Sequence, residues 1–164
     1  MMHSNDIWRH FTQPRSAVGL AMFRIVYSLT LLAEVLQLFY LRHLVFDATA
    51  SPLGSDVWAG PLFGLWVVSI LCLAIGLYTR TAAVFNYAMT LVSFSLFDFW
   101  EYHVDYVFTG VNCFLMFVPV GRAVSVDAWI TRRRHARLGL PAPQARVPRI
   151  HYDALILVGI AMVY

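Results

Sequence analysis

The chain is poor in charge and contains no lysine. Only 13% of its 164 residues are charged, and all 12 basic residues are arginine. A soluble globular domain averages about 25% charged residues, so this chain has too little charge to cover a surface that faces water on all sides. In addition, 60% of the residues are hydrophobic. The composition therefore predicts a membrane protein.

Common catalytic and metal-binding motifs are also missing. The sequence has no phosphate-binding glycine loop, no nucleophile elbow, no Cys-x-x-Cys pair and no metal-type histidine spacing, so we expect no metal site. The two cysteines, Cys72 and Cys113, lie inside apolar runs and are predicted to pack rather than to pair. The arginines lie beside apolar runs, which favours anionic lipid over nucleic acid as the partner.

Four apolar segments are long enough to cross a bilayer as helices, which takes about 20 residues. They comprise residues 17–41, 61–79, 81–100 and 104–120, and a fifth apolar run begins at residue 153. The predicted fold class is an all-α membrane protein: a polytopic transmembrane helix bundle with four full spans and the start of a fifth. Residues 1–16 are expected to form a cytoplasmic or interfacial segment. Residues 17–164 are expected to form a truncated transmembrane domain, which includes a basic helix and linker at 122–152.

The arginines give the predicted bundle a direction. With the N-terminus in the cytoplasm, ten arginines lie on the cytoplasmic side, Arg42 lies outside and Arg24 lies within the first span. The positive-inside rule therefore predicts a multi-pass protein of the plasma or inner membrane with a cytoplasmic N-terminus. The segment from 125 to 138 should form an interfacial helix. We expect it to place Arg132, Arg133 and Arg134 on the phosphates of anionic lipids.

Polar residues inside the predicted spans are the first site candidates: Arg24, Glu34, Asn86 and Asn112. Charges within a membrane often mark functional sites, but a polar seam that joins helices also explains such residues. Depth along the spans puts Asn86 and Asn112 in one layer with Arg24. Glu34 is assigned to the same seam, one layer further out. We favour the structural seam, while the long Arg24 side chain could also reach the inner interface.

His103 is the candidate catalytic residue. It follows the third span, with Glu101 and Asp105 close by, and a histidine there can act as an acid or a base. An exposed loop histidine without a chemical role is the alternative, and the residues alone favour that alternative.

Four short motifs, in order along the chain, resemble the horizontally transferred transmembrane (HTTM) family, which includes the vitamin K-dependent gamma-carboxylase. They are Phe23-Arg24-Ile25, the run from Gly76 to Arg80, His103, and Gly121-Arg122 followed by Ser125-Val126-Asp127. Carboxylase-like members oxidise vitamin K hydroquinone and use the energy to deprotonate a glutamate side chain. The resemblance implies that His103 matches a functional histidine. It also implies that vitamin K hydroquinone or another quinone is the cofactor.

Two departures from the family pattern limit what the resemblance implies. The family's catalytic base is a lysine beyond the position of residue 164, and this sequence has no lysine. The later helices and the soluble C-terminal domain of the family are missing as well. We therefore expect the N-terminal membrane part of such a protein, without catalysis of its own. One alternative is a quinone- or lipid-linked oxidoreductase or carboxylase-like enzyme, completed by missing sequence or a partner chain. A small transporter is a further alternative, suggested only by Arg24 and Glu34.

Overall fold

The computed structural model describes residues 4–45, 56–95 and 103–163, and most of them are helical. The all-α prediction is confirmed, and two of the helices, within Val18–Tyr40 and Val57–Ile75, are long and apolar enough to cross a membrane. The elements are α1 (Ser4–Thr12), β1 (Pro14–Ser16), α2 (Val18–Tyr40), α3 (Arg42–Val45), α4 (Asp56–Ile75), α5 (Thr79–Ser95), α6 (His103–Phe117), α7 (Val126–Arg137), β2 (Arg146–Pro148) and α8 (Ile150–Val163).

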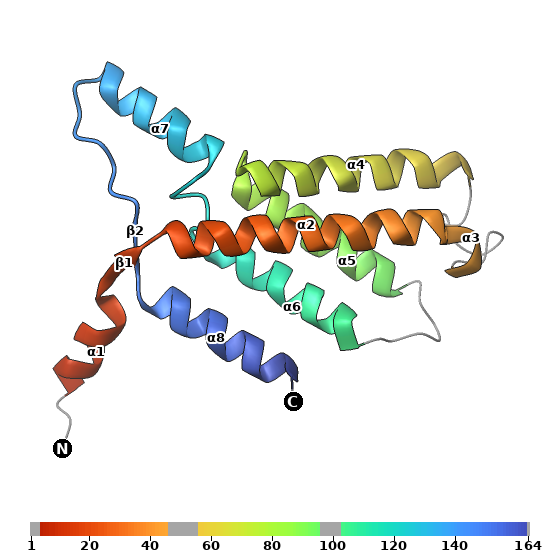
Figure 1. Ribbon diagram of the computed structural model, residues 1–164, viewed down its shortest axis with the longest axis horizontal. Coiled ribbons are helices and arrows are strands. Elements are labelled where there is room, and N and C mark those ends of the chain that lie inside the picture. The colour runs from red at the N-terminus through yellow and green to blue at the C-terminus, as the bar shows by residue number, and fades with distance from the viewer. Residues whose placement is uncertain (1–3, 46–55, 96–102, 164) are drawn as a thin grey trace.

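The helices pack mainly against their neighbours in the chain. Helix α2 packs on α4, α4 on α5 and α5 on α6, and α8 lies along the open side of α6 (Figure 1). The α4–α5 turn, α7 and the two strands all lie at one end of this bundle, and α3 lies at the other (Figure 1). We call the first of these the α7 end.

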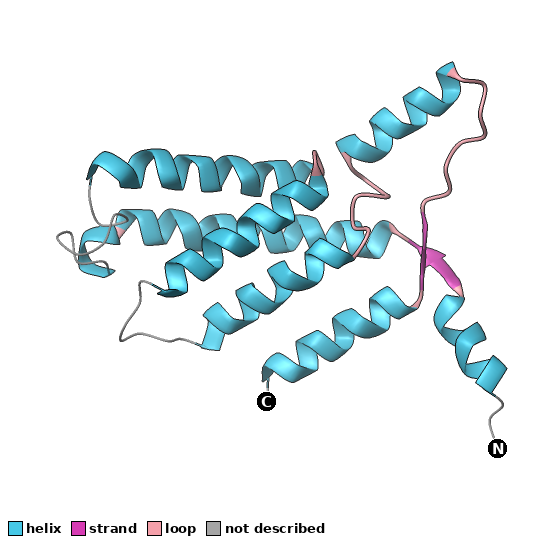
Figure 2. Cartoon of the chain, turned by 180° about the vertical axis from the view of Figure 1, so that it is seen from behind, coloured by secondary structure: helices cyan, strands magenta, loops and turns pink. Residues whose placement is uncertain are grey.

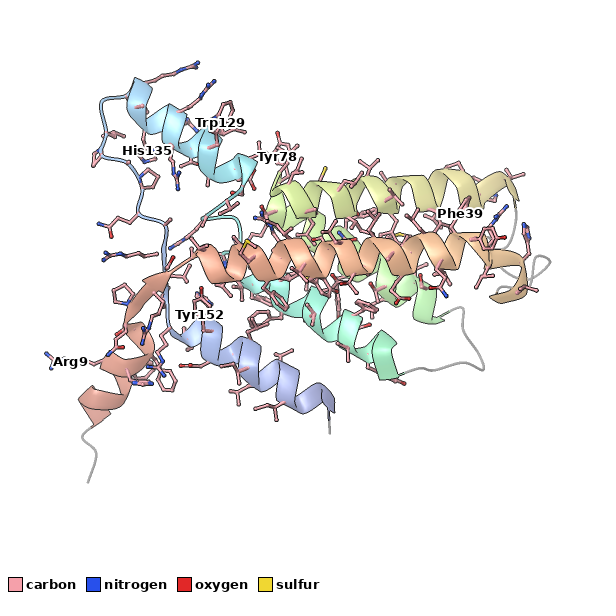
Figure 3. The ribbon with its side chains drawn as sticks, viewed as in Figure 1. Arg9, Phe39, Tyr78, Trp129, His135 and Tyr152 are labelled. Atoms are coloured by element: carbon pink, nitrogen blue, oxygen red, sulfur yellow. The ribbon has the colours of Figure 1, made fainter. Side chains whose placement is uncertain are left out.

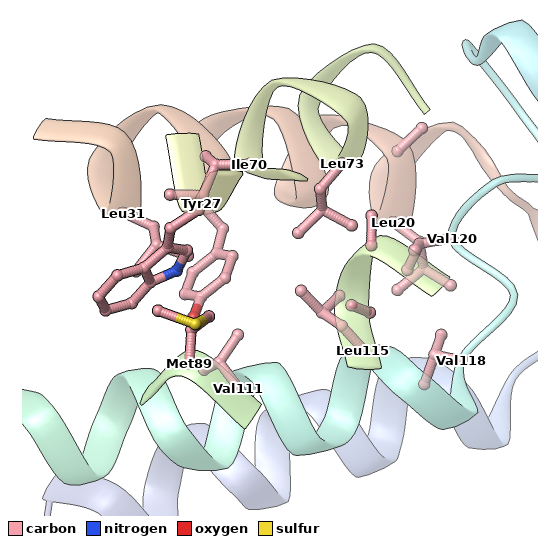
Figure 4. Close-up of a cluster of buried hydrophobic side chains, with 14 of the residues drawn as sticks. Leu20, Tyr27, Leu31, Ile70, Leu73, Met89, Val111, Leu115, Val118 and Val120 are labelled. Carbon is pink, nitrogen blue, oxygen red and sulfur yellow. The ribbon is translucent and has the colours of Figure 1, made fainter. Parts of the chain in front are cut away.

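A continuous apolar core joins the four central helices. Side chains on α2 are buried every three or four residues, which is the spacing of one helix face. They meet Ile70 and Leu73 of α4, Met89 of α5, and Val111 and Leu115 of α6 (Figure 4). The α2 stripe is Leu20, Arg24, Tyr27, Leu31 and Val35, so one arginine occupies a core position.

Helix α4 differs from the predicted second span at both ends. It begins at Asp56, before Pro61, and it ends at Ile75. Pro61 lies inside this helix and removes one backbone hydrogen bond. The other backbone hydrogen bonds of the 20-residue helix maintain it. The helix stops at Ile75 because Gly76 takes a left-handed conformation, with φ of +73°. The Leu77 N–H donates to Cys72 O at 2.8 Å and the Gly76 N–H to Leu73 O at 3.2 Å, which is a Schellman cap.

The other predicted helices match more closely. The first span, predicted at 17–41, is α2, and the interfacial helix, predicted at 125–138, is α7. Ser125 is the N-cap of α7, and its hydroxyl accepts from the Ala128 N–H at 3.0 Å. The third and fourth spans correspond to α5 and α6, although residues 96–102 lie outside the described part of the chain.

A short β-ribbon, which no pattern in the sequence predicts, ties the N-terminal segment to the linker. Strand β1 pairs antiparallel with β2, with Arg15 opposite Val147 (Figure 2). The bonds Ala17 N–H to Ala145 O and Arg149 N–H to Gln13 O, both 2.9 Å, continue the pairing. Three-residue strands that each contain a proline carry no alternating pattern, so periodicity could not reveal them.

Candidate functional site

Arg24 is fully buried and binds backbone carbonyls at the α7 end. Its Nη1 donates to Val120 O at 3.0 Å, and its Nη2 donates to Val124 O at 2.7 Å and Ala74 O at 3.3 Å. Ala74 lies in the last turn of α4, and Val120 and Val124 lie in the loop between α6 and α7. A single guanidinium therefore joins α2, the end of α4 and this loop.

Asp127, in the first turn of α7, binds the start of α5. Its Oδ1 accepts from the Tyr78 N–H at 3.0 Å, and its Oδ2 accepts from the Thr79 N–H at 3.0 Å and the Thr79 hydroxyl at 2.7 Å. Its own N–H donates to Gly76 O at 3.0 Å. The first N–H groups of a helix have no partner within the helix, so Asp127 acts as a cap for α5 supplied by α7.

Arg24 and Asp127 contact the two ends of the α4–α5 turn. Arg24 contacts the carbonyl end of α4, where the helix dipole is negative, and Asp127 contacts the N–H end of α5, where the dipole is positive. Each charge is thus matched by backbone dipoles. This arrangement explains how an arginine can be buried at 0% exposure in an apolar core.

Two glycines make this close approach possible. A Cβ on Gly76 would lie 2.6 Å from Arg24 Nη1 and would also collide with Ser125 Cβ. A Cβ on Gly121 would lie 2.7 Å from Thr79 Oγ1. We refer to Arg24, Gly76, Thr79, Gly121 and Asp127 together as the arginine hub.

A second polar group lies deeper in the bundle, around Asn86. Its Oδ1 accepts from Trp66 Nε1 at 3.1 Å, and its Nδ2 donates to Ala82 O at 2.8 Å. Asn112 of α6 donates from Nδ2 to Thr90 Oγ1 at 3.0 Å, which links α6 to α5. All of these side chains are buried, and the Asn112 Oδ1 has no hydrogen-bond partner among the described residues.

The structure corrects two expectations about these polar residues. Glu34 is exposed on α2, so its assignment to the polar seam is wrong. Arg24 shares no hydrogen bond with Asn86 or Asn112, because its long side chain extends to the carbonyls at the α7 end. Depth along separate helices had suggested the layers, but the direction of each side chain depends on how the helices pack.

The residues with catalytic potential form no cluster in the described part of the chain. His103 is the first residue of α6, but its side chain lies outside the described residues, as do Trp100, Glu101 and Tyr102. Within the described ranges, no group of three His, Cys, Asp or Glu residues could hold a metal ion. Cys72 and Cys113 are free thiols, each half-buried. In the described residues, the charged side chains of Arg24 and Asp127 bind backbone carbonyl and N–H groups, which compensate their charges.

Asp127 is the functional residue that reasoning from polarity along the spans missed, since it lies outside any apolar run. A signal was nevertheless present, because three of the four short motifs singled out in the sequence meet in the arginine hub. They contribute Arg24, the turn from Gly76 to Thr79, and Gly121 with Asp127. Comparisons with protein-family models, with curated proteins and with solved structures found no match to this chain.

Proposed function

We propose that the chain is an integral-membrane helical domain of the HTTM, carboxylase-like kind, in which the polar interior has a structural role. The observation that carries the proposal is the inverted polarity of the bundle. Arg24, Asn86 and Asn112 are completely buried, whereas Val26 of α2 is 60% exposed and Leu65 of α4 is 54% exposed. A helix in the core of a soluble protein has the opposite pattern.

The exposed apolar side chains form continuous stripes. Val18, Met22, Val26 and Leu29 recur at helical spacing along α2, and the exposed face of α4 holds Leu65, Val68, Leu71 and Ile75. A contiguous apolar surface of this kind suits lipid rather than water. Helices α5 and α6 have 17 and 15 described residues, and α5 packs on α4 while α6 packs on α5, which supports their crossing with α4.

The positions of the arginines support a cytoplasmic α7 end. Ten of the twelve lie on α1, the ribbon, the start of α5, the α6–α7 loop, α7 or the residue just before α8, and Arg42 lies on α3 at the opposite end (Figure 1). The positive-inside rule then orients the domain with its N-terminus in the cytoplasm of a cell or inner membrane.

Helix α7 has the composition of an interfacial anchor. Trp129 is 52% exposed and Ile130 is 47% exposed, and the Arg133 guanidinium lies 3.8 Å from the centre of the Trp129 ring (Figure 3). An aromatic ring at the headgroup level beside arginines suits an anionic membrane surface. Through Asp127, the same helix is bonded to the membrane-facing bundle.

Carbonate extraction and reporter fusions test the proposal. After expression in a bacterial inner membrane, the chain should resist extraction by alkaline carbonate. Alkaline phosphatase fused after Ser55 should be active, and phosphatase fused after Arg137 should be inactive. Activity at Arg137 and not at Ser55 would reverse the topology, and release of the protein by carbonate would refute membrane insertion.

A further inference from the structure

We propose that the α7 end contains a binding site for the phosphate group of one anionic phospholipid, formed by Arg80, Arg122 and Arg132. The proposal rests on the membrane orientation proposed above, which brings this end to the cytoplasmic headgroup layer. It goes beyond general attraction of α7 to a charged surface, because it assigns one lipid to one place between α7 and the bundle.

Two adjoining cavities form the site. The first, of about 330 Å³, is lined by Arg80 at the start of α5 and by Arg122 in the α6–α7 loop. The second, of about 340 Å³, is lined by Arg122 and by Arg132 of α7. Gly121, Arg122 and Asp127 line both cavities, so the two meet at the arginine hub. Their volumes fall within the range of about 300–1,000 Å³ that is usual for small-ligand sites.

The charge around the cavities suits a phosphate. Three guanidinium groups stand against one carboxylate, and both Asp127 oxygens already accept hydrogen bonds from the start of α5. Neither Arg80 nor Arg132 forms an ion pair with any described carboxylate. Arg122 donates from Nη1 to Arg146 O at 3.2 Å, which fixes its position and leaves further N–H groups to donate. Arginine binds phosphate oxygens in a bidentate way.

The rest of the lining is mostly apolar, and the proposed orientation places it at the headgroup layer, which favours a lipid over a soluble phosphate ester. The first cavity is also lined by the partly exposed Pro119 and by the margins of Leu115, Val118 and Val120, which are themselves almost fully buried. A ligand that satisfies both parts has an anionic phosphate at one end and hydrocarbon next to it. A phosphodiester lipid such as phosphatidylglycerol has this form.

The test uses the purified chain in nanodiscs, and native mass spectrometry counts retained phosphatidylglycerol. The site variant is Arg80→Gln with Arg132→Gln, which leaves the Arg122–Arg146 contact in place. The control variant is Arg134→Gln with Arg137→Gln, which removes the same charge from α7 residues that line neither cavity. Loss of charge-assisted hydrogen bonds should weaken binding of the first lipid about tenfold in the site variant. The control should bind it like the unmodified chain.

Three outcomes would overturn the site. Equal weakening in both variants would mean diffuse attraction to basic residues. Loss of folding by the site variant in phosphatidylcholine nanodiscs would mean that the arginines have a structural role. If the unmodified chain retained glycerol phosphate or inorganic phosphate as strongly as phosphatidylglycerol, the site would be assigned to a soluble phosphate. Failure to enter phosphatidylcholine nanodiscs at all would instead refute the proposed membrane function, independently of these arginines.

Discussion

At the scale of single residues, Arg24 determines how three segments meet. Its guanidinium donates hydrogen bonds to three backbone carbonyls, of which Val120 O is buried and Ala74 O and Val124 O are partly buried. An arginine in a predicted span is usually regarded as a functional charge, yet here the partners are backbone dipoles. The hydrogen bonds of Arg24 therefore stabilise the fold.

Replacement of Arg24 by leucine should lower the free energy of unfolding by about 3 kcal/mol or more, because three carbonyls lose their donors at about 1 kcal/mol or more each. Arg24→Lys should lower the free energy of unfolding by less, because the lysine ammonium can still donate to some of the three carbonyls. Thermal unfolding in detergent measures both. Arg137→Leu, at an exposed site on α7, serves as the control and should change stability by no more than about 0.5 kcal/mol.

Gly76 combines a left-handed backbone with a crowded site, and three glycines separate these effects. Gly76→Ala should cost the strain of φ +73°, about 1–2 kcal/mol, and a further displacement of Arg24. Gly139→Ala, with φ of +65° and open space, should cost the strain alone. Gly64→Ala, in helix α4 with open space, should be neutral or slightly stabilising. Equal unfolding temperatures for the Gly76 and Gly139 variants would contradict the crowding.

The polar residues of the bundle should rank by the bonds they make. Asn86→Leu removes bonds to Trp66, Ser69 and Ala82 and should cost about 1–2 kcal/mol. Asn112→Leu removes one bond and an unpaired oxygen, so its cost should be about 0.6 kcal/mol or less. Glu34→Leu, at an exposed position, should cost nothing. A Glu34 variant as unstable as the Asn86 variant in detergent melts would refute this ranking.

At the scale of elements, the position of α7 depends on Asp127. This carboxylate caps α5 and so holds the first turn of α7 against the α4–α5 turn, where Tyr78 lies (Figure 3). Helix α7 is otherwise mostly exposed, and none of its described residues is fully buried. The described contacts that hold the orientation of the helix are therefore the carboxylate and backbone N–H of Asp127 and the N-cap of the helix itself.

Asp127→Ala should release α7 and open the first turn of α5. Charge-assisted hydrogen bonds contribute about 1.5–3 kcal/mol, so amide exchange at Tyr78 and Thr79 should accelerate by a factor of ten or more, on the order set by this energy. Hydrogen exchange followed by mass spectrometry gives the rates. Asp153→Ala is the matched control, because its pair with Arg149 at 3.5 Å is partly exposed and should contribute about 1 kcal/mol or less. Unchanged exchange in the Asp127 variant would show that α7 is held by other contacts.

At the scale of the whole molecule, the buried polar side chains of the described residues bind partners within the bundle, and a catalytic role for His103 stays a prediction. The proposed structural role predicts that the 164-residue chain does not oxidise vitamin K hydroquinone. Assays in nanodiscs should give the same background for the unmodified chain, His103→Ala and His43→Ala. Turnover that disappears only in the His103 variant would refute the structural role and favour the quinone-linked enzyme.

The sequence alone was sufficient to predict the helices, and it predicted their ends where neighbouring residues in the chain determine them. Apolar run length gave α2, and Ser125 and Gly139 gave the limits of α7. It was insufficient where a helix end depends on a distant group. Asp127 starts α5 two residues before the predicted span, and the ribbon between residues 14–16 and 146–148 joins segments far apart in the chain.

Tertiary structure alone decided which polar residues meet. Arg24, Gly76 and Asp127 are separated by about 50 residues each, and no periodicity relates their positions. Glu34 and Arg24 have the same kind of position in the sequence, inside one apolar helix, yet one is exposed and the other is buried. The sequence fixes the face of a helix on which a residue lies. Only the packing of that face, against protein or against its surroundings, determines whether a charge needs partners.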